Sequence, residues 1–219
     1  MLFTRSIPKR KYRNYTRYRN LLRTDFQYRC AYCLTHEFHN GGVANFAIDH
    51  HRPRHGTYAI SDLANEYTNL YWACNECNQN KANQWPSPQE EAMGLRWIDP
   101  CEAWGNHDLH WKISPDGEIQ WLTPEGQYTI KKLMLHRREW LKNHWRKLSK
   151  VQTKYDMLMA QREELLSLLA QKESEASERA SALRTMDDLT KTLMELKAEL
   201  EPPVFNRPRT DPDDVWFLP

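Results

Sequence analysis

Two short motifs decide the fold of this chain, Cys30-Ala31-Tyr32-Cys33 and Cys74-Asn75-Glu76-Cys77. Each tight turn can direct two thiolates at one point, so the two motifs together supply the four sulfurs of a closed tetrahedral zinc site. Four protein ligands leave no open coordination position, and the zinc is therefore expected to be structural. Two disulfides or four buried thiols are the alternative, but the CxxC spacing and an N-terminus without a secretory signal favour the metal.

The chemistry is expected to lie between and just after these motifs. Asp49 and His50 are neighbours in the joining segment, and Asn78 directly follows the second motif. A carboxylate and an amide oxygen suit Mg²⁺ or Mn²⁺, because these ions prefer oxygen ligands. A neutral imidazole can take a proton from water near pH 7. These residue types predict a cation site at Asp49 and Asn78, with His50 as a general base.

The order of the motifs resembles that of the HNH endonucleases, whose core is a ββα-metal fold. The family pattern of CxxC, Asp-His-x-x-Pro, Asn-Leu and Cys-x-x-Cys-Asn-x-x-Lys is matched within residues 30–81 of the 219. Each fragment alone is a weak signal, and their occurrence in this order makes the match specific. The resemblance implies that Asp49 and Asn78 bind the catalytic cation and that His50 activates the attacking water.

Two further roles follow only from this resemblance. Asn69 would hold the loop that orients His50, and Lys81 would sit near the phosphate. At the position after His50 the family usually has an apolar residue, whereas this chain has His51. In the family, the base is the residue directly after the aspartate, which is His50 in this chain. We therefore expect His51 to pack into the core, as the family's apolar residue would.

A Trp-Pro pair after the last motif, Trp85-Pro86, extends the likeness to one group of HNH subunits. Such subunits occur in Septu-type and retron-linked antiphage systems, where the nuclease works with an ATPase partner. The resemblance therefore implies an effector of bacterial antiphage defence. The C-terminal helices would bind the ATPase or, alternatively, a second copy of this chain.

The N-terminal segment is strongly basic. Residues 1–29 carry nine Lys or Arg and one acid, Asp25, and tyrosines recur at Tyr12, Tyr15 and Tyr18. Cations with interleaved rings suit phosphate contacts and base stacking. An amphipathic helix whose tyrosines pack on the core is an alternative reading, and the two are compatible. The candidate nucleic-acid contacts are Lys9, Arg10, Lys11, Arg13, Arg52 and Arg54.

The remainder of the chain is expected to contain a β-hairpin followed by long helices. Strand-like segments at 109–113 and 119–123 flank Pro115-Asp116-Gly117, which favours the hairpin. Residues 127–201 contain no Gly or Pro, and a heptad frame from Leu141 predicts a coiled-coil helix or helical hairpin with a break near 172–182. The predicted class is α+β, with a basic segment (1–29), an HNH nuclease domain with zinc site and hairpin (30–129), a helical segment (130–200) and a Pro-rich tail (201–219).

The predicted function is metal-dependent hydrolysis of phosphodiester bonds in nucleic acid. DNA is favoured over RNA, although a water nucleophile requires no 2′-hydroxyl. The alternative is a zinc-dependent nucleic-acid-binding or protein-interaction module without catalysis, which would not need Asp49, His50 and Asn78 together. The net charge of +2 says little about partners. No apolar run approaches the length of a membrane span, so we expect a cytoplasmic protein.

Overall fold

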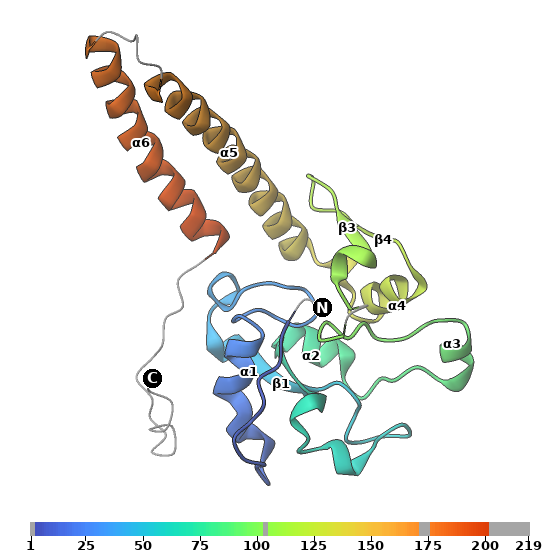
Figure 1. Cartoon of the computed structure of the whole chain (residues 1–219). Coiled ribbons are helices and arrows are strands. Elements are labelled where there is room, and N and C mark those ends of the chain that lie inside the picture. Colours follow the sequence, from blue (N-terminus) through green and yellow to red (C-terminus); the bar gives the residue numbers. More distant parts are fainter. Residues whose placement is uncertain (1–2, 103–104, 171–175, 202–219) are drawn as a thin grey trace.

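The computed structural model describes residues 3–102, 105–170 and 176–201, and it contains a core domain from which two long helices project (Figure 1). Mixed helices and two small sheets confirm the α+β class. The helices are α1 (Arg19–Asp25), α2 (Asn75–Lys81), α3 (Pro88–Ala92), α4 (Pro124–Lys132), α5 (Glu139–Ala170) and α6 (Ala176–Leu200). The strands are β1 (Phe46–His50), β2 (Leu70–Cys74), β3 (Trp111–Ile113) and β4 (Ile119–Trp121). The predicted Pro-rich tail lies outside the described residues apart from Glu201.

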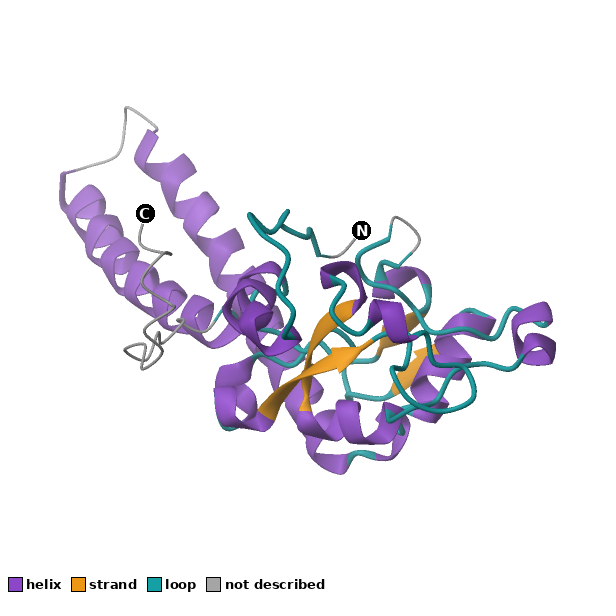
Figure 2. Ribbon diagram, turned by 90° about the horizontal axis from the view of Figure 1, so that it is seen from below, coloured by secondary structure: helices purple, strands orange, loops and turns teal. Residues whose placement is uncertain are grey.

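The predicted ββα unit consists of β1, β2 and α2. The two strands pair antiparallel (strands are orange in Figure 2), and the register places Asp49 opposite Tyr71. All five residues of β2 are buried, as expected for an apolar strand that is covered on both faces. The helix follows β2 directly, because the Cys74 sulfur caps it by accepting a hydrogen bond from the Cys77 N–H. The zinc motif therefore also starts the helix that carries Asn78 and Lys81.

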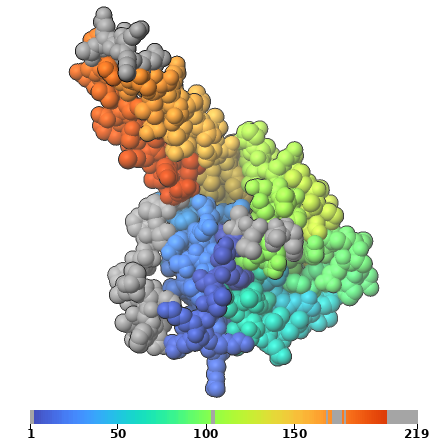
Figure 3. All heavy atoms as spheres, viewed as in Figure 1, coloured from blue at the N-terminus to red at the C-terminus, as the bar shows by residue number. Residues whose placement is uncertain are grey.

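The N-terminal segment lies along the surface of the core domain (dark blue in Figure 3). Phe3 is buried, and the Arg5 guanidinium donates hydrogen bonds to the carbonyl oxygens of Tyr67 and Leu70 at 3.0 and 2.8 Å. Regular structure begins only at Tyr15, in a 3-10 turn that leads into α1. The amphipathic helix considered from the sequence is thus short, and Arg5 is engaged by the fold.

The predicted β-hairpin is confirmed as β3 and β4, with Ile113 paired to Ile119. Its turn lies against the first turns of α5. A Cβ atom at Gly117, whose φ is +80°, would lie 2.1 Å from the carbonyl oxygen of Lys142. Only glycine allows both this backbone conformation and this close approach.

The long helices α5 and α6 lie side by side as a hairpin (Figures 1 and 2), which was one of the two predicted alternatives. The heptad frame predicts seam positions for Val151, Leu183 and Leu193. Val151 and Leu193 are buried, whereas Leu183 is 56% exposed, and Leu196, which the frame does not place at the seam, is buried as well. The frame from Leu141 therefore holds at Leu193 in α6 but not at Leu183.

The end of α6 returns to the core domain, where its last carbonyls are bound. Arg29 donates to the Leu200 oxygen at 3.3 Å, and His39 Nε2 donates to the Glu199 oxygen at 3.1 Å. Cationic or polar donors at a helix C-terminus satisfy carbonyls that the helix itself leaves unpaired. No helix in the described part of the chain is both long enough and apolar enough to cross a membrane.

Candidate active site and zinc centre

The four motif cysteines converge on one point. Cys30, Cys33, Cys74 and Cys77 are all buried, and their sulfurs lie within 4.8 Å of one another. The Cys33 and Cys74 sulfurs are 3.8 Å apart. Four sulfurs held ~2.3 Å from a tetrahedral zinc lie about 3.8 Å from each other, so the cluster fits this ion. All four are free thiols, which removes the disulfide alternative.

The surroundings of the cluster suit thiolates. The N–H groups of Tyr32 and Cys77 each donate to a motif sulfur at 3.5 Å. Arg138, which directly precedes α5, is 5% exposed and donates to the Cys77 sulfur at 3.3 Å. Burial raises the pKa of the Cys30 and Cys77 thiols, whereas the hydrogen bond with Cys30 and those with the other two thiols lower the pKa of Cys33. A bound zinc would favour the thiolate form of all four. No sequence motif marks Arg138, because it is far along the chain from the cysteines.

Two buried groups, the Tyr32 hydroxyl and the Lys81 ammonium, contact the Asp49 carboxylate. Asp49 is 4% exposed, and its Oδ2 accepts a hydrogen bond from the Tyr32 hydroxyl. Lys81 Nζ lies 3.1 Å from Oδ2 and 3.4 Å from Oδ1. Burial and the neighbouring carboxylate raise the pKa of Tyr32 well above its usual range, so the phenol stays protonated and remains a donor.

Lys81 does not occupy the place that the resemblance implied. Its side chain is fully buried behind Asp49, so the ammonium is shielded from any phosphate in the pocket. It donates instead to the His50 carbonyl oxygen at 2.7 Å. A buried ammonium is tolerated only with such partners, and β1 supplies both the Asp49 carboxylate and the His50 carbonyl oxygen. Lys81 can therefore act on the site only through Asp49 and the β1 backbone.

The His50 imidazole is held by one hydrogen bond to the backbone. Its Nε2 lies 2.9 Å from the Ala64 carbonyl oxygen and must be the donor, which leaves the lone pair on Nδ1. The Tyr15 ring meets the imidazole edge-on, with 4.7 Å between ring centroids. Burial lowers the pKa of His50 below its usual value, against the opposing effect of the Ala64 hydrogen bond. The imidazole is therefore neutral at neutral pH.

The Asn69 side chain forms hydrogen bonds with the backbone of the loop that follows β1. Its Oδ1 accepts from the Arg52 N–H at 2.7 Å, and its Nδ2 donates to the carbonyl oxygens of Arg52 and Leu63 at 3.1 Å each. The Asn69 carbonyl oxygen accepts from the His51 N–H at 2.9 Å. These bonds lie directly after His50 in the chain, which suits the expected role of Asn69 in orienting the loop.

His51 packs among rings and is not among the residues that line the pocket with His50. Its imidazole stacks on Tyr71 at 4.7 Å and meets the edge of Trp85 at 5.5 Å. Burial lowers the pKa of His51 to about 3. The ring thus occupies the position where an apolar side chain was expected.

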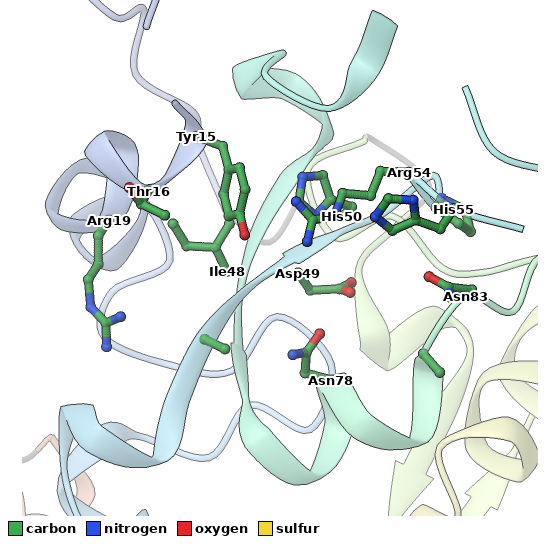
Figure 4. A pocket seen from close by; sticks show the side chains of 13 residues that line it. Tyr15, Thr16, Arg19, Ile48, Asp49, His50, Arg54, His55, Asn78 and Asn83 are labelled. Carbon is green, nitrogen blue, oxygen red and sulfur yellow. The ribbon is translucent and has the colours of Figure 1, made fainter. Parts of the chain in front are cut away.

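The predicted cation ligands and base line one pocket of about 460 Å³. In Figure 4 the side chains of Asp49 and Asn78 point towards a common space, with His50 beside it. Tyr15 and His55 line the same pocket and were not assigned to it from the sequence. The spacing of the N-terminal tyrosines was the only signal for Tyr15, and His55 had none beyond its nearness to His50 in the chain.

The candidate nucleic-acid contacts divide into two groups. Arg54 is exposed, lines the pocket and lies over the Tyr15 ring at 5.2 Å. Arg52 is half-buried, donates to the Tyr58 carbonyl oxygen at 2.8 Å and lies over the Trp85 ring at 4.3 Å, so the fold engages it. The exposed candidates of the N-terminal segment are Lys9, Arg10, Lys11 and Arg13.

Comparison with known proteins gives one match. Residues 30–84 match the family described as HNH endonuclease. Neither the curated proteins nor the solved structures contain a significant match to the chain. The matched residues contain both cysteine motifs, β1, β2 and α2, which form the zinc centre and one wall of the pocket. The chain therefore contains, at residues 30–84, a segment that matches the HNH endonuclease family.

Proposed function

We propose that the protein is a metal-dependent endonuclease that hydrolyses phosphodiester bonds in nucleic acid, with DNA preferred over RNA. One observation carries this proposal. In a segment of the HNH family, a neutral histidine with an available Nδ1 lines the same pocket as the oxygen donors of Asp49 and Asn78. A binding module without catalysis would need the zinc centre but not this arrangement.

The residues divide the reaction between them. His50 Nδ1 accepts a proton from the attacking water, and the bond from its Nε2 to Ala64 fixes the ring and its tautomer. Asp49 and Asn78 would hold Mg²⁺ or Mn²⁺, which when bound stabilises negative charge on the phosphate and the leaving oxygen. Arg54 lies at the pocket and is suited to contact a neighbouring phosphate. The exposed basic residues of the N-terminal segment would add affinity without sequence preference.

Cleavage should persist to lower pH than an ordinary histidine base allows. The base must be neutral, and burial holds the pKa of His50 below 6.5, so the rate falls only as pH drops through this lowered value. In a profile of kcat/KM against pH, we expect the acidic limb to lie below pH 6.5. Zinc content is measured at each pH to separate this limb from acid release of zinc. An acidic limb above pH 6.5, with zinc retained, would contradict the assignment.

The proposed activity is tested by incubating the purified, zinc-loaded chain with plasmid, single-stranded DNA and RNA, each with Mg²⁺ or Mn²⁺ and without either ion. We expect DNA cleavage that requires one of the ions. Failure to cleave any of the three substrates, alone or together with an ATPase encoded beside it, would favour the binding module. Cleavage of RNA alone would reverse the substrate preference.

A finer proposal concerns the partner. We propose that an ATPase binds the α5–α6 hairpin in the cytoplasm. Two observations support this: the likeness to HNH subunits of antiphage systems, and the exposed apolar side chains of Met157 and Met194 on the hairpin. Self-association through the same hairpin is the alternative. The variant Met157→Glu/Met194→Glu should weaken co-purification with the ATPase, or dimer formation measured by light scattering. Unchanged association of the double variant would place the contact elsewhere.

A further inference from the structure

We infer that Tyr32, inside the first cysteine motif, is a positioning residue for the catalytic cation, because its phenol fixes the carboxylate of Asp49. This inference rests on the proposed function and assigns a residue that the motifs leave unspecified. It also links the two metal sites physically, since one residue contacts a ligand of each.

Tyr32 contacts both sites directly. Its backbone N–H donates to the Cys30 sulfur at 3.5 Å, and its hydroxyl donates to Asp49 Oδ2. The side chain is 1% exposed, so water does not compete for this bond. A hydrogen bond to a carboxylate in a water-free environment is both stronger and more directional than one at the surface.

The two oxygens of Asp49 are engaged unequally. Oδ2 accepts from Tyr32 and lies 3.1 Å from Lys81 Nζ, whereas among the described residues Oδ1 has only the longer Lys81 contact of 3.4 Å. The carboxylate extends into the space that Asn78 also faces (Figure 4). This inequality leaves Oδ1 as the oxygen better able to bind a cation. A magnesium-type ion demands near-ideal geometry, so the direction of that oxygen determines affinity.

Lys81 cannot supply this direction alone. Its ammonium is shared with the His50 carbonyl oxygen at 2.7 Å, and an ammonium is a rotating point charge at the end of a flexible stem. The Tyr32 ring is rigid and packed, stacked on Tyr71 with 6.3 Å between centroids and tilted against Trp97 at 6.4 Å. The phenol therefore defines where the carboxylate lies, while Lys81 balances its charge.

The test measures Mn²⁺ affinity of the zinc-loaded full chain by electron paramagnetic resonance, so that cleavage is not the readout. Tyr32→Phe removes only the hydroxyl, and loss of an outer-shell partner of this kind lowers metal affinity about 10–100-fold. The matched control is Tyr67→Phe, which removes a similar bond from a tyrosine hydroxyl to Asp25 Oδ2 at 2.5 Å. We expect weaker Mn²⁺ binding in Tyr32→Phe alone, with zinc content and thermal stability checked in both variants.

Asp49→Ala in the same assay separates the inference from the proposed function. If Asp49→Ala loses Mn²⁺ but Tyr32→Phe binds it like the parent, the role of Tyr32 is overturned and the cation site stands. Equal losses in Tyr32→Phe and Tyr67→Phe would show a general effect of packing and also overturn it. If Asp49→Ala binds Mn²⁺ as tightly as the parent, the proposed cation site itself is wrong. A second readout is cleavage at saturating Mn²⁺, where Tyr32→Phe should approach the parental rate.

Discussion

Replacing His50 with alanine should lower single-turnover cleavage by about 10²–10⁴-fold, the usual cost of losing a general base. The variant keeps Asp49, Asn78 and the zinc centre, so zinc content and nucleic-acid affinity should remain at the parental level. The cleavage rate should be lower even at saturating substrate, because the imidazole contributes to proton transfer and not to substrate binding. Cleavage is measured with enzyme in excess over a labelled DNA, with Mg²⁺ present.

His51→Ala is the matched control, since it removes the same ring one residue further along. The His51 imidazole packs on Tyr71 and Trp85, so its loss should cost about 1–3 kcal/mol of the free energy of unfolding. Cleavage by the folded variant should stay close to that of the parent. The reverse pattern, with His51→Ala inactive and His50→Ala active, would move the base to His51 and shift the family register by one residue.

Replacing Cys74 with serine should release the zinc and unfold the core domain. Binding of a structural zinc contributes about 10–16 kcal/mol of apparent free energy, which is comparable to the whole stability of a small domain. Cys74 also caps α2 and ends β2, so its loss separates the helix that carries Asn78 from the strand pair. Far-UV circular dichroism and zinc analysis measure both effects.

Cys101→Ser provides the control for this variant. Cys101 is a free thiol outside the cluster and is only partly buried, so its replacement should leave one zinc per chain and the fold unchanged. A Cys74→Ser protein that is zinc-free, folded and active would contradict the structural role of the metal.

Much of the site could be predicted because its residues are marked locally. The CxxC turns, Asp49-His50 and Asn78 each lie within a short motif, and metal chemistry restricts which residue types can serve there. The β-hairpin was likewise recognised from its turn residues, and apolar spacing indicated either a long helix or a helical hairpin.

The remaining features depend on contacts between distant segments. Nothing in the sequence shows that Tyr32 reaches Asp49, or that Arg138 returns to the Cys77 sulfur. The burial of Lys81 was missed for the same reason, because a lysine after a helix turn is ordinarily exposed. The heptad frame holds at Leu193 and fails at Leu183, which is exposed on α6.

Single-turnover cleavage by Asp49→Ala over a range of Mg²⁺ concentrations tests most directly whether the pocket is a cation-dependent nuclease site. Asp62→Ala, which removes an exposed acid from the same domain, is the control, and zinc content is verified in both. We predict that the parent and Asp62→Ala cleave DNA only when Mg²⁺ or Mn²⁺ is added. Asp49→Ala should be inactive at concentrations that saturate the parent and partly active at much higher ones. Cleavage by Asp49→Ala at the parental rate and with the parental Mg²⁺ dependence would contradict the proposed site.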